Sequence, residues 1–329
     1  MPNCSISTTP EFLQSEFFLQ TSMYLITTFG LPIHIFGAYC ILLKTPERMS
    51  DMKWAMLNLH LWSSGYDISL GYLLIPFLMY PATAGTSLGV LTDLGCPLPF
   101  QIVIGAAVLA SVIVSVTCLF ETRYFYLYAE NSNWRLFRKP WLLVNYLLAF
   151  TYSIPTCLMI PEQLEAKLYF KTAIPCLSDF LFDDRVLVLS VHNMEIATNV
   201  ALVVFPIQLQ SFLFIILIYR NMKNLETLSK LSKKTLDLQR KFLKALILQV
   251  TIPVAIVSGP MIYNGYAGIT IHYNQGFNNV ATLVMSIHGT VSTVVMILVQ
   301  KPYREVVMRC LKVSRAQTKI RNVSNVTLT

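Results

Sequence analysis

Charged residues are scarce in this chain. Asp, Glu, Lys and Arg make up 13% of its 329 residues, whereas about a quarter is usual in soluble domains. Hydrophobic residues reach 54%, and the mean hydropathy is +0.56. We therefore predict an integral membrane protein. The net charge of +8 does not indicate a nucleic-acid partner, because the basic residues fall only between particular hydrophobic runs.

The sequence also lacks the patterns of an enzyme or a metalloprotein. It contains no phosphate-binding glycine loop, no Cys-x-x-Cys pair, and no nucleophile with a base at a recognisable spacing. We therefore expect no enzymatic activity, no metal site and no cofactor. The first residues lack the basic stretch and the small-residue cleavage site of a signal peptide, so the first hydrophobic run is expected to remain as a membrane span.

Long hydrophobic runs are abundant. About 20 apolar residues cross a hydrocarbon core of roughly 30 Å. We predict an all-α membrane protein, a seven-transmembrane helix bundle. The expected spans cover about 17–43, 54–80, 100–128, 141–161, 197–220, 242–269 and 277–300, between an N-terminal segment 1–16 and a C-terminal segment 301–329. Leucines spaced among lysines after the fifth span predict helical extensions that project from the membrane.

The distribution of Lys and Arg decides the expected orientation. The predicted loops 44–53, 123–139 and 220–244, together with the C-terminal segment, hold 22 of the 25 basic residues. Since basic loops tend to stay in the cytoplasm, we predict an extracellular N-terminus and a cytoplasmic C-terminus. Asn3 is then a usable glycosylation acceptor, whereas Asn322 and Asn325 face the cytosol.

A basic amphipathic segment follows the last span. After the joint formed by Lys301, Pro302, Tyr303 and Arg304, apolar residues at 306, 307, 310 and 311 form a one-sided stripe with cations around it. We predict a short helix on the cytoplasmic membrane surface, in contact with lipids. The joint either only anchors this helix or also moves. Cys310 is a candidate for palmitoylation, with an ordinary packed thiol as the alternative.

Asp67 is the one carboxylate well inside a predicted span. Such a charge is costly unless it is paired or hydrated, so Asp67 should face the bundle interior. Its expected partners are polar residues of the seventh span, namely Ser286, His288, Thr290 or Ser292. We predict an internal polar network of Asp67, Ser286 and His288 that rearranges on activation. A neutral, hydrogen-bonded structural aspartate is the alternative.

Glu121 and Arg123 lie at the predicted cytoplasmic end of the third span. They are two residues apart and do not share a helical face, but each can reach a neighbouring helix. We predict that they form a two-state switch between helices. The alternative is that Arg123 only anchors the topology, with its charge extended to the lipid head groups.

Six stretches, taken in order, resemble one family. They are PIHIFGAYCILLKTPERM (32–49), WAMLNLHLW (54–62), LFETRY (119–124), IPEQ (160–163), IPC (174–176) and HGTVSTVVMILVQKPYR (288–304). Their order and spacing resemble the nematode seven-transmembrane chemoreceptors called serpentine receptor class H. The resemblance implies a G-protein-coupled receptor for small chemical cues in the plasma membrane, expected in the ciliary membrane of sensory neurons. A receptor of this kind would bind its ligand among the outer halves of the helices and a heterotrimeric G protein at their inner ends.

The resemblance also bears on the cysteines and on the alternative functions. It implies a disulfide between Cys96 and Cys176, while two unpaired thiols or a bridge with Cys4 remain alternatives. The chain departs from rhodopsin-like receptors because a threonine separates Glu121 from Arg123, so the switch mechanics of those receptors do not transfer directly. A seven-span ligand-gated ion channel is the alternative function. The known channels of that kind would place the N-terminus inside, against the charge distribution.

Overall fold

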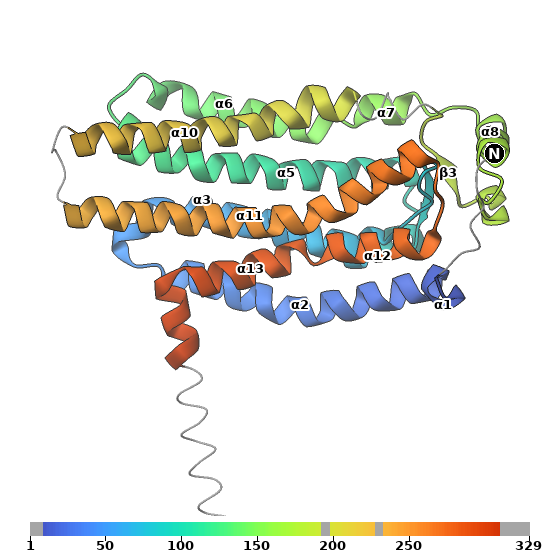
Figure 1. The fold of residues 1–329 in the computed structure, drawn as a ribbon, viewed down its shortest axis with the longest axis horizontal. Coiled ribbons are helices and arrows are strands. Elements are labelled where there is room, and N and C mark those ends of the chain that lie inside the picture. The colour runs from blue at the N-terminus through green and yellow to red at the C-terminus, as the bar shows by residue number, and fades with distance from the viewer. Residues whose placement is uncertain (1–8, 192–197, 228–232, 310–329) are drawn as a thin grey trace, which may run out of the picture.

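Long helices run side by side along the long axis of the molecule (Figure 1). The computed structural model describes residues 9–191, 198–227 and 233–309. In chain order the helices are α1 (Glu11–Gln14), α2 (Glu16–Lys44), α3 (Ser50–Ile68), α4 (Val90–Asp93), α5 (Leu98–Tyr124), α6 (Trp134–Thr151), α7 (Ile154–Leu158), α8 (Gln163–Ala173), α10 (Phe205–Thr227), α11 (Lys233–Thr270), α12 (Gln275–Ser286) and α13 (His288–Val299). Seven rods form the bundle in the described ranges: α2, α3, α5, α6 with α7, α10, α11, and α12 with α13. The predicted all-α bundle is confirmed.

Short turns complete the helical framework. Wider π-helical turns extend α3 over Ser69–Leu74, extend α5 over Phe125–Ala129 and precede α10 over Val200–Val204. Single 3-10 turns lie at Glu47–Met49 and Asp179–Phe182. Beyond α13 the chain is helical again over 301–309. The extensions expected between the fifth and sixth spans are present, because α10 continues to Thr227 and α11 begins at Lys233.

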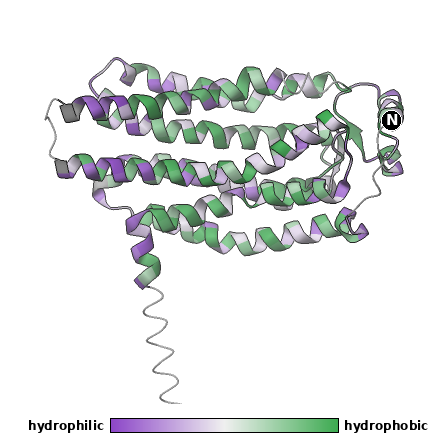
Figure 2. Ribbon diagram, in the orientation of Figure 1, coloured by the Kyte–Doolittle hydropathy of each residue, from purple (hydrophilic) through white to green (hydrophobic). Residues whose placement is uncertain are grey.

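Six of the described segments are long and apolar enough to cross a membrane. They are Glu16–Lys44, Leu98–Ala129, Trp134–Leu158, Val200–Asn224, Lys234–Thr270 and Gln275–Val299. The remaining rod, α3, is a continuous helix, but five polar residues, Asn58, His60, Ser63, Ser64 and Asp67, lower its hydropathy. Hydrophobic residues cover the middle of the bundle and hydrophilic residues gather toward its ends (Figure 2). This distribution is the one expected when lipid surrounds the middle of the bundle.

The second predicted span, 54–80, is wrong in its last part. Its helical turns end at Leu74, and Ile75 adopts a left-handed backbone with a φ of 40°. Pro76 explains the change, because a proline lacks the N–H that a helix needs and disfavours helical geometry in the residue before it. The apolar residues that follow form a strand instead of another helical turn.

A three-stranded antiparallel sheet closes one end of the bundle. Strand β1 (Pro76–Leu78) pairs with β2 (Ala84–Ser87), and β2 pairs with β3 (Leu187–Val188). Phe77 lies opposite Thr86, and Ala84 lies opposite Val188. We call this end of the bundle the sheet end. The opposite end carries Lys44, Lys234 and Lys301, and we call it the basic end.

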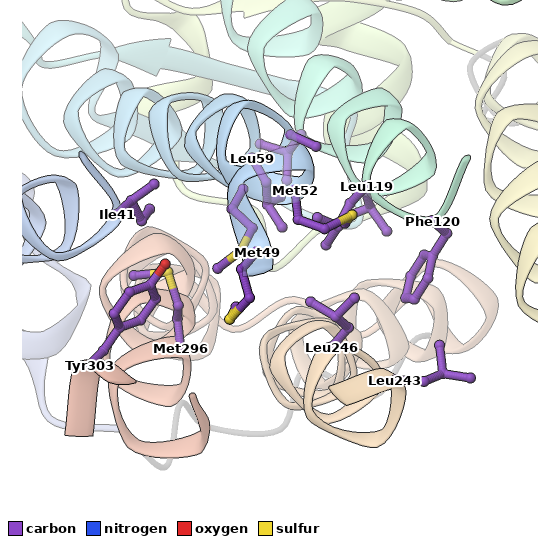
Figure 3. Packing of buried hydrophobic residues seen from close by; sticks show 14 of the residues in the cluster. Ile41, Met49, Met52, Leu59, Leu119, Phe120, Leu243, Leu246, Met296 and Tyr303 are labelled. Carbon is purple, nitrogen blue, oxygen red and sulfur yellow. The ribbon is translucent and has the colours of Figure 1, made fainter. Parts of the chain in front are cut away.

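Two buried apolar clusters stabilise the two ends. At the sheet end, the start of α2 packs with the sheet and with the segment that follows α8, through Leu19, Met23, Phe77, Leu177 and Leu181. The larger cluster extends from the middle of the bundle to the basic end and draws residues from α2, α3, α5, α10, α11 and α13. In Figure 3, Met296 and Tyr303 lie on one side of this cluster and Leu243, Leu246 and Phe120 on the other.

Two of the rods depart from straight helices. α11 contains Pro253 and Pro260 and bends toward the sheet end (Figure 1). The seventh rod is interrupted at Ile287, which separates α12 from α13. Prolines remove backbone hydrogen bonds and account for the bend in α11. The interruption at Ile287 has no proline. It is stabilised by the side chain of Asp67 on α3, as described below.

Candidate functional site

Asp67 caps the second half of the seventh rod. One carboxylate oxygen accepts the backbone N–H of Gly289 at 2.7 Å, and the other accepts the N–H of Thr290 at 2.6 Å and its hydroxyl at 2.9 Å. The first N–H groups of a helix lack partners within the helix and favour a negative charge. Asp67 is 2% exposed, so its burial is compensated by these three donors. The interruption at Ile287 supplies the free N–H groups that make this possible.

A close approach of backbones brings α3 and α13 together at this point. A Cβ atom at Gly289 would collide with the carbonyl oxygen of Ser63. Only glycine leaves room for the α13 N-terminus to lie this near α3. The position of Gly289 therefore determines whether Asp67 can reach the exposed N–H groups.

Two histidines extend the polar contacts to α2. His34 Nε2 lies 3.3 Å from the Asp67 carboxylate and 3.2 Å from the Thr290 hydroxyl. His34 Nδ1 lies 3.0 Å from the Ser64 hydroxyl, and His60 Nε2 lies 2.9 Å from the carbonyl oxygen of His34. These residues tie α2, α3 and α13 into one buried unit, which we call the Asp67 cluster.

The predicted polar network is right in one of its contacts and wrong in others. Thr290, one of the four expected partners, binds Asp67. Ser286 and His288 make no described hydrogen bond to Asp67: the Ser286 hydroxyl donates to the carbonyl oxygen of Leu283 at 2.9 Å, and His288 packs edge-on against Tyr66. The reason is the helix interruption, which turns backbone N–H groups toward the carboxylate in place of those side chains. His34 is the partner that sequence reasoning left unassigned.

A cavity of about 560 Å³ lies beside the Asp67 cluster. Residues of α3, α5, α10, α11 and α13 line it, and we call it the bundle cavity. It is lined by Leu59, Ser63, Leu109, Val112, Ile113, Val116, Gln208, Phe212, Gln249, Val250, Pro253, Val254, Val257, Ser258, Met261, Ile262, His288 and Ser292. The lining residues of α5 and α11 come from the middle of each helix, so the cavity lies at mid-depth. Its volume is in the range of small-molecule sites.

Three residues that line the cavity each carry a buried polar atom without a hydrogen-bond partner among the described residues. These atoms are Ser63 Oγ, Gln249 Oε1 and His288 Nδ1. The side chains are 1%, 2% and 8% exposed. Buried polar atoms without partners are rare, because each one loses its hydration without compensation. Three such atoms in one apolar cavity mark it as the candidate ligand site.

Glu121 is held by α6 at the basic end. Its carboxylate lies 3.0 Å from the guanidinium of Arg138 and accepts the indole N–H of Trp134 at 2.8 Å. Glu121 is 2% exposed, and the Arg138 guanidinium also stacks over the Phe125 ring at 3.9 Å. This pair links the third and fourth rods.

Arg123 points to a different helix. Its guanidinium lies 4.6 Å from the centre of the Phe242 ring on α11, and its Nε has no described hydrogen-bond partner. Glu121 and Arg123 therefore contact different rods and not each other. The expectation that each reaches a neighbouring helix agrees with this geometry, whereas their role as a switch stays a prediction.

The joint after α13 is anchored by Tyr303. This side chain is fully buried, and its hydroxyl lies 2.7 Å from that of Thr45 at the end of α2. The Thr45 hydroxyl donates to the carbonyl oxygen of Ile41, so the Tyr303 hydroxyl donates to Thr45. Burial raises the pKa of Tyr303 further above neutrality.

The other joint residues are less constrained. The chain leaves α13 at Gln300, which has an extended backbone, and the next helix has Pro302 in its first turn, where a missing N–H is tolerated. Arg304 donates to the carbonyl oxygen of Leu298 at 3.3 Å. The Lys301 ammonium is exposed and 3.9 Å from Glu305. The helical segment 301–309 runs across the direction of α13 (Figure 1).

The predicted disulfide between Cys96 and Cys176 is wrong. Cys96 has a free thiol, whereas Cys176 is disulfide-bonded. Cys96 follows α4 at the start of α5, but the segment around Cys176 packs through Ile174 and Leu177 onto the sheet-end cluster.

Two other predicted sites fall outside the described ranges. Asn3 and Cys310 lie outside the described residues, so glycosylation and palmitoylation stay predictions. Within residues 9–191, 198–227 and 233–309, no group of three His, Cys, Asp or Glu side chains is placed to hold a metal ion.

Comparisons with known proteins cover most of the chain. The sequence matches the family model described as serpentine type 7TM GPCR chemoreceptor Srh over residues 14–313. Serpentine receptor class H-72 of Caenorhabditis elegans is 27% identical over 306 residues, which covers 90% of this chain and 86% of the relative. Both the bundle and the segment after α13 lie within the matched family range.

Proposed function

Because this chain belongs to the serpentine type seven-transmembrane G-protein-coupled chemoreceptor family Srh, we propose that it binds a small chemical cue in the bundle cavity and signals to a heterotrimeric G protein. The family membership confirms the resemblance drawn from the six sequence stretches. The chain is thus an integral membrane chemoreceptor of the G-protein-coupled type, and the ligand site and the coupling to a G protein are the proposal.

One observation supports the ligand site above all others: the cavity wall and the interruption of the seventh rod share residues. His288 lines the cavity and directly precedes Gly289, whose N–H binds Asp67. Ser63 of α3 also lines the cavity, and its carbonyl is the atom that Gly289 approaches. A ligand in contact with His288 and Ser63 therefore acts on the contact between α3 and α13.

Activation follows from this arrangement by a shift of population. A ligand favours whichever arrangement of α3 and α13 it binds more tightly, and it shifts the receptor by that difference in affinity. The Asp67 cluster is the element that has to rearrange, because it holds α2, α3 and α13 together. At the basic end, separation of Arg123 from Phe242 would free α11 from α5 and open a surface for the G protein.

The proposed orientation places the sheet end outside and the basic end in the cytoplasm. The concentration of Lys and Arg on one side of the spans supports it. The ligand then reaches mid-depth, somewhat deeper than the outer half expected from the family resemblance. We place the receptor in the plasma membrane, in the cilia of sensory neurons.

A ligand screen with two readouts tests the function. Cells that express the receptor are exposed to volatile and pheromone-like molecules while cAMP, cGMP, calcium and membrane current are recorded. We expect a response that disappears when G proteins are blocked and that is missing in cells without the receptor. Current that persists under the block would refute G-protein coupling and favour a channel.

A further inference from the structure

We propose that the bundle cavity selects uncharged, mainly apolar molecules that carry a hydroxyl group. This inference rests on the proposed function only in taking the bundle cavity as the ligand site. It concerns the chemistry of the ligand, which the family membership leaves open.

Charged ligands are excluded by the composition of the wall. Among the described residues that line the cavity, none is Asp, Glu, Lys or Arg. The nearby Asp67 is no substitute, because both of its oxygens already accept hydrogen bonds from Gly289 and Thr290. An ion placed in this cavity would lose its hydration without a partner of opposite charge, which is strongly unfavourable.

The apolar part of the wall determines the body of the ligand. Aliphatic side chains from three helices, among them Val112 and Val116 of α5, Val250 and Val254 of α11, and Leu59 of α3, make up most of the surface. Burial of an apolar ligand against them is favourable in proportion to the area removed from water. The body should therefore be a hydrocarbon chain or ring.

The three unpartnered polar atoms determine the functional group. Gln249 Oε1 is only an acceptor and requires a donor from the ligand, whereas the Ser63 hydroxyl donates as well as accepts. His288 Nδ1 donates or accepts according to its tautomer. A ketone, an ether or a hydrocarbon offers no donor to Gln249. A hydroxyl is the smallest neutral group that supplies a donor and an acceptor together.

A photolabelling experiment tests this chemistry without any signalling step. The purified receptor in lipid nanodiscs is labelled with a diazirine derivative of 1-octanol, and the labelled peptides are mapped by mass spectrometry. 1-Octanol, octane, octanoate and octylammonium serve as competitors. We expect label on peptides of α11 and α13 that line the cavity, full competition by 1-octanol, about fivefold weaker competition by octane, and none by the two ions.

Two variants and a matched control connect the label to the polar atoms. Ser63→Ala and Gln249→Leu should each weaken competition by 1-octanol about fivefold, and leave octane unchanged. Ser111→Ala should have no effect, because Ser111 of α5 does not line the cavity and its hydroxyl donates to the carbonyl oxygen of Ala107 at 2.8 Å. Thermal unfolding of each purified variant confirms that it is folded.

The possible outcomes separate this inference from the proposed function. Equal competition by octane or octylammonium, or equal effects of Ser63→Ala and Ser111→Ala, would overturn the selection for a hydroxyl. A charged or carbonyl ligand that signals through a G protein from this cavity would also overturn it, while the proposed function stood. Selective labelling by the hydroxyl probe in a receptor that never couples to a G protein would support the inference and contradict the function.

Discussion

Asp67 is the residue that connects the sequence to the site most directly. Its isolation inside an apolar run indicated that it faces the interior, and it is buried there with three hydrogen bonds. The identity of its donors was harder to predict, because two of them are backbone N–H groups that exist only where the seventh rod is interrupted. Gly289 was the available signal, since a glycine within a span often marks a close approach of two backbones.

Asp67→Asn should destabilise the receptor by roughly 2 kcal/mol. The carboxylate accepts three hydrogen bonds, whereas the amide of asparagine has one oxygen acceptor and an NH2 group that would face the N–H donors of α13. Thermal unfolding of the purified protein measures the loss, and surface expression and ligand response are recorded in parallel. Asp237→Asn is the control, since Asp237 is exposed and its described ion pair is with Lys241 on the same helix. Equal stability of the two variants would contradict the capping role of Asp67.

Gly289→Ala adds a single methyl group but should destabilise the receptor strongly. The added Cβ would clash with the Ser63 carbonyl and force α13 away from α3. Gly259→Ala on α11 is the matched control, since open space surrounds that position, and alanine is favoured over glycine in a helix by up to about 1 kcal/mol. We expect a lower unfolding temperature for Gly289→Ala and an unchanged or higher one for Gly259→Ala. A neutral Gly289→Ala would show that the approach of α3 to α13 is not tight.

At the scale of elements, the sequence predicted long helices well and their endings less well. The last part of the second predicted span was assigned to helix because its apolar residues continue without a charge, yet β1 and β2 form a hairpin there. Pro76 and the glycines of the hairpin were the signals against helix. The pairing of β2 with β3 and the position of the segment around Cys176 were not predicted. Both depend on contacts between segments distant in the chain, which a single sequence does not specify.

The contact between α5 and α11 at the basic end carries a prediction about signalling. Phe242→Leu removes the ring under Arg123, and a cation–π contact of this kind contributes roughly 1 kcal/mol. If this contact holds the inactive arrangement, basal signalling should rise about fivefold at matched surface expression. Phe137→Leu is the control, because Phe137 is 61% exposed on α6. Basal cAMP or calcium measures the effect, and unchanged or lower basal signalling would argue against a switch at Arg123.

For the whole molecule, composition and charge carried most of the information. Low charge and long apolar runs predicted a membrane bundle, which the helices and the family membership confirm. The bundle cavity was not predictable from the sequence, because its lining residues come from five helices that lie far apart in the chain. The unpartnered state of Ser63, Gln249 and His288 is likewise a property of the assembled bundle.

The orientation of the whole molecule has an independent test. If the N-terminus is outside, Asn3 is glycosylated, and removal of glycans or the change Asn3→Gln should give the same increase in gel mobility. Asn322→Gln should leave mobility unchanged, because that sequon would face the cytosol. A shift with Asn322→Gln and none with Asn3→Gln would reverse the orientation.

The burial of Tyr303 has a consequence for the order of assembly during synthesis. The partner of its hydroxyl, Thr45, lies 258 residues earlier in the chain, and Tyr303 belongs to the same apolar cluster as Ile41, Met49 and Met296. The ribosome makes the chain from its N-terminus. The basic end of α2 therefore becomes fully packed only after all the other rods have been synthesised and inserted. A chain truncated before residue 303 would leave apolar surface at the basic end of α2 uncovered. Membrane quality control would then recognise the receptor as incompletely folded.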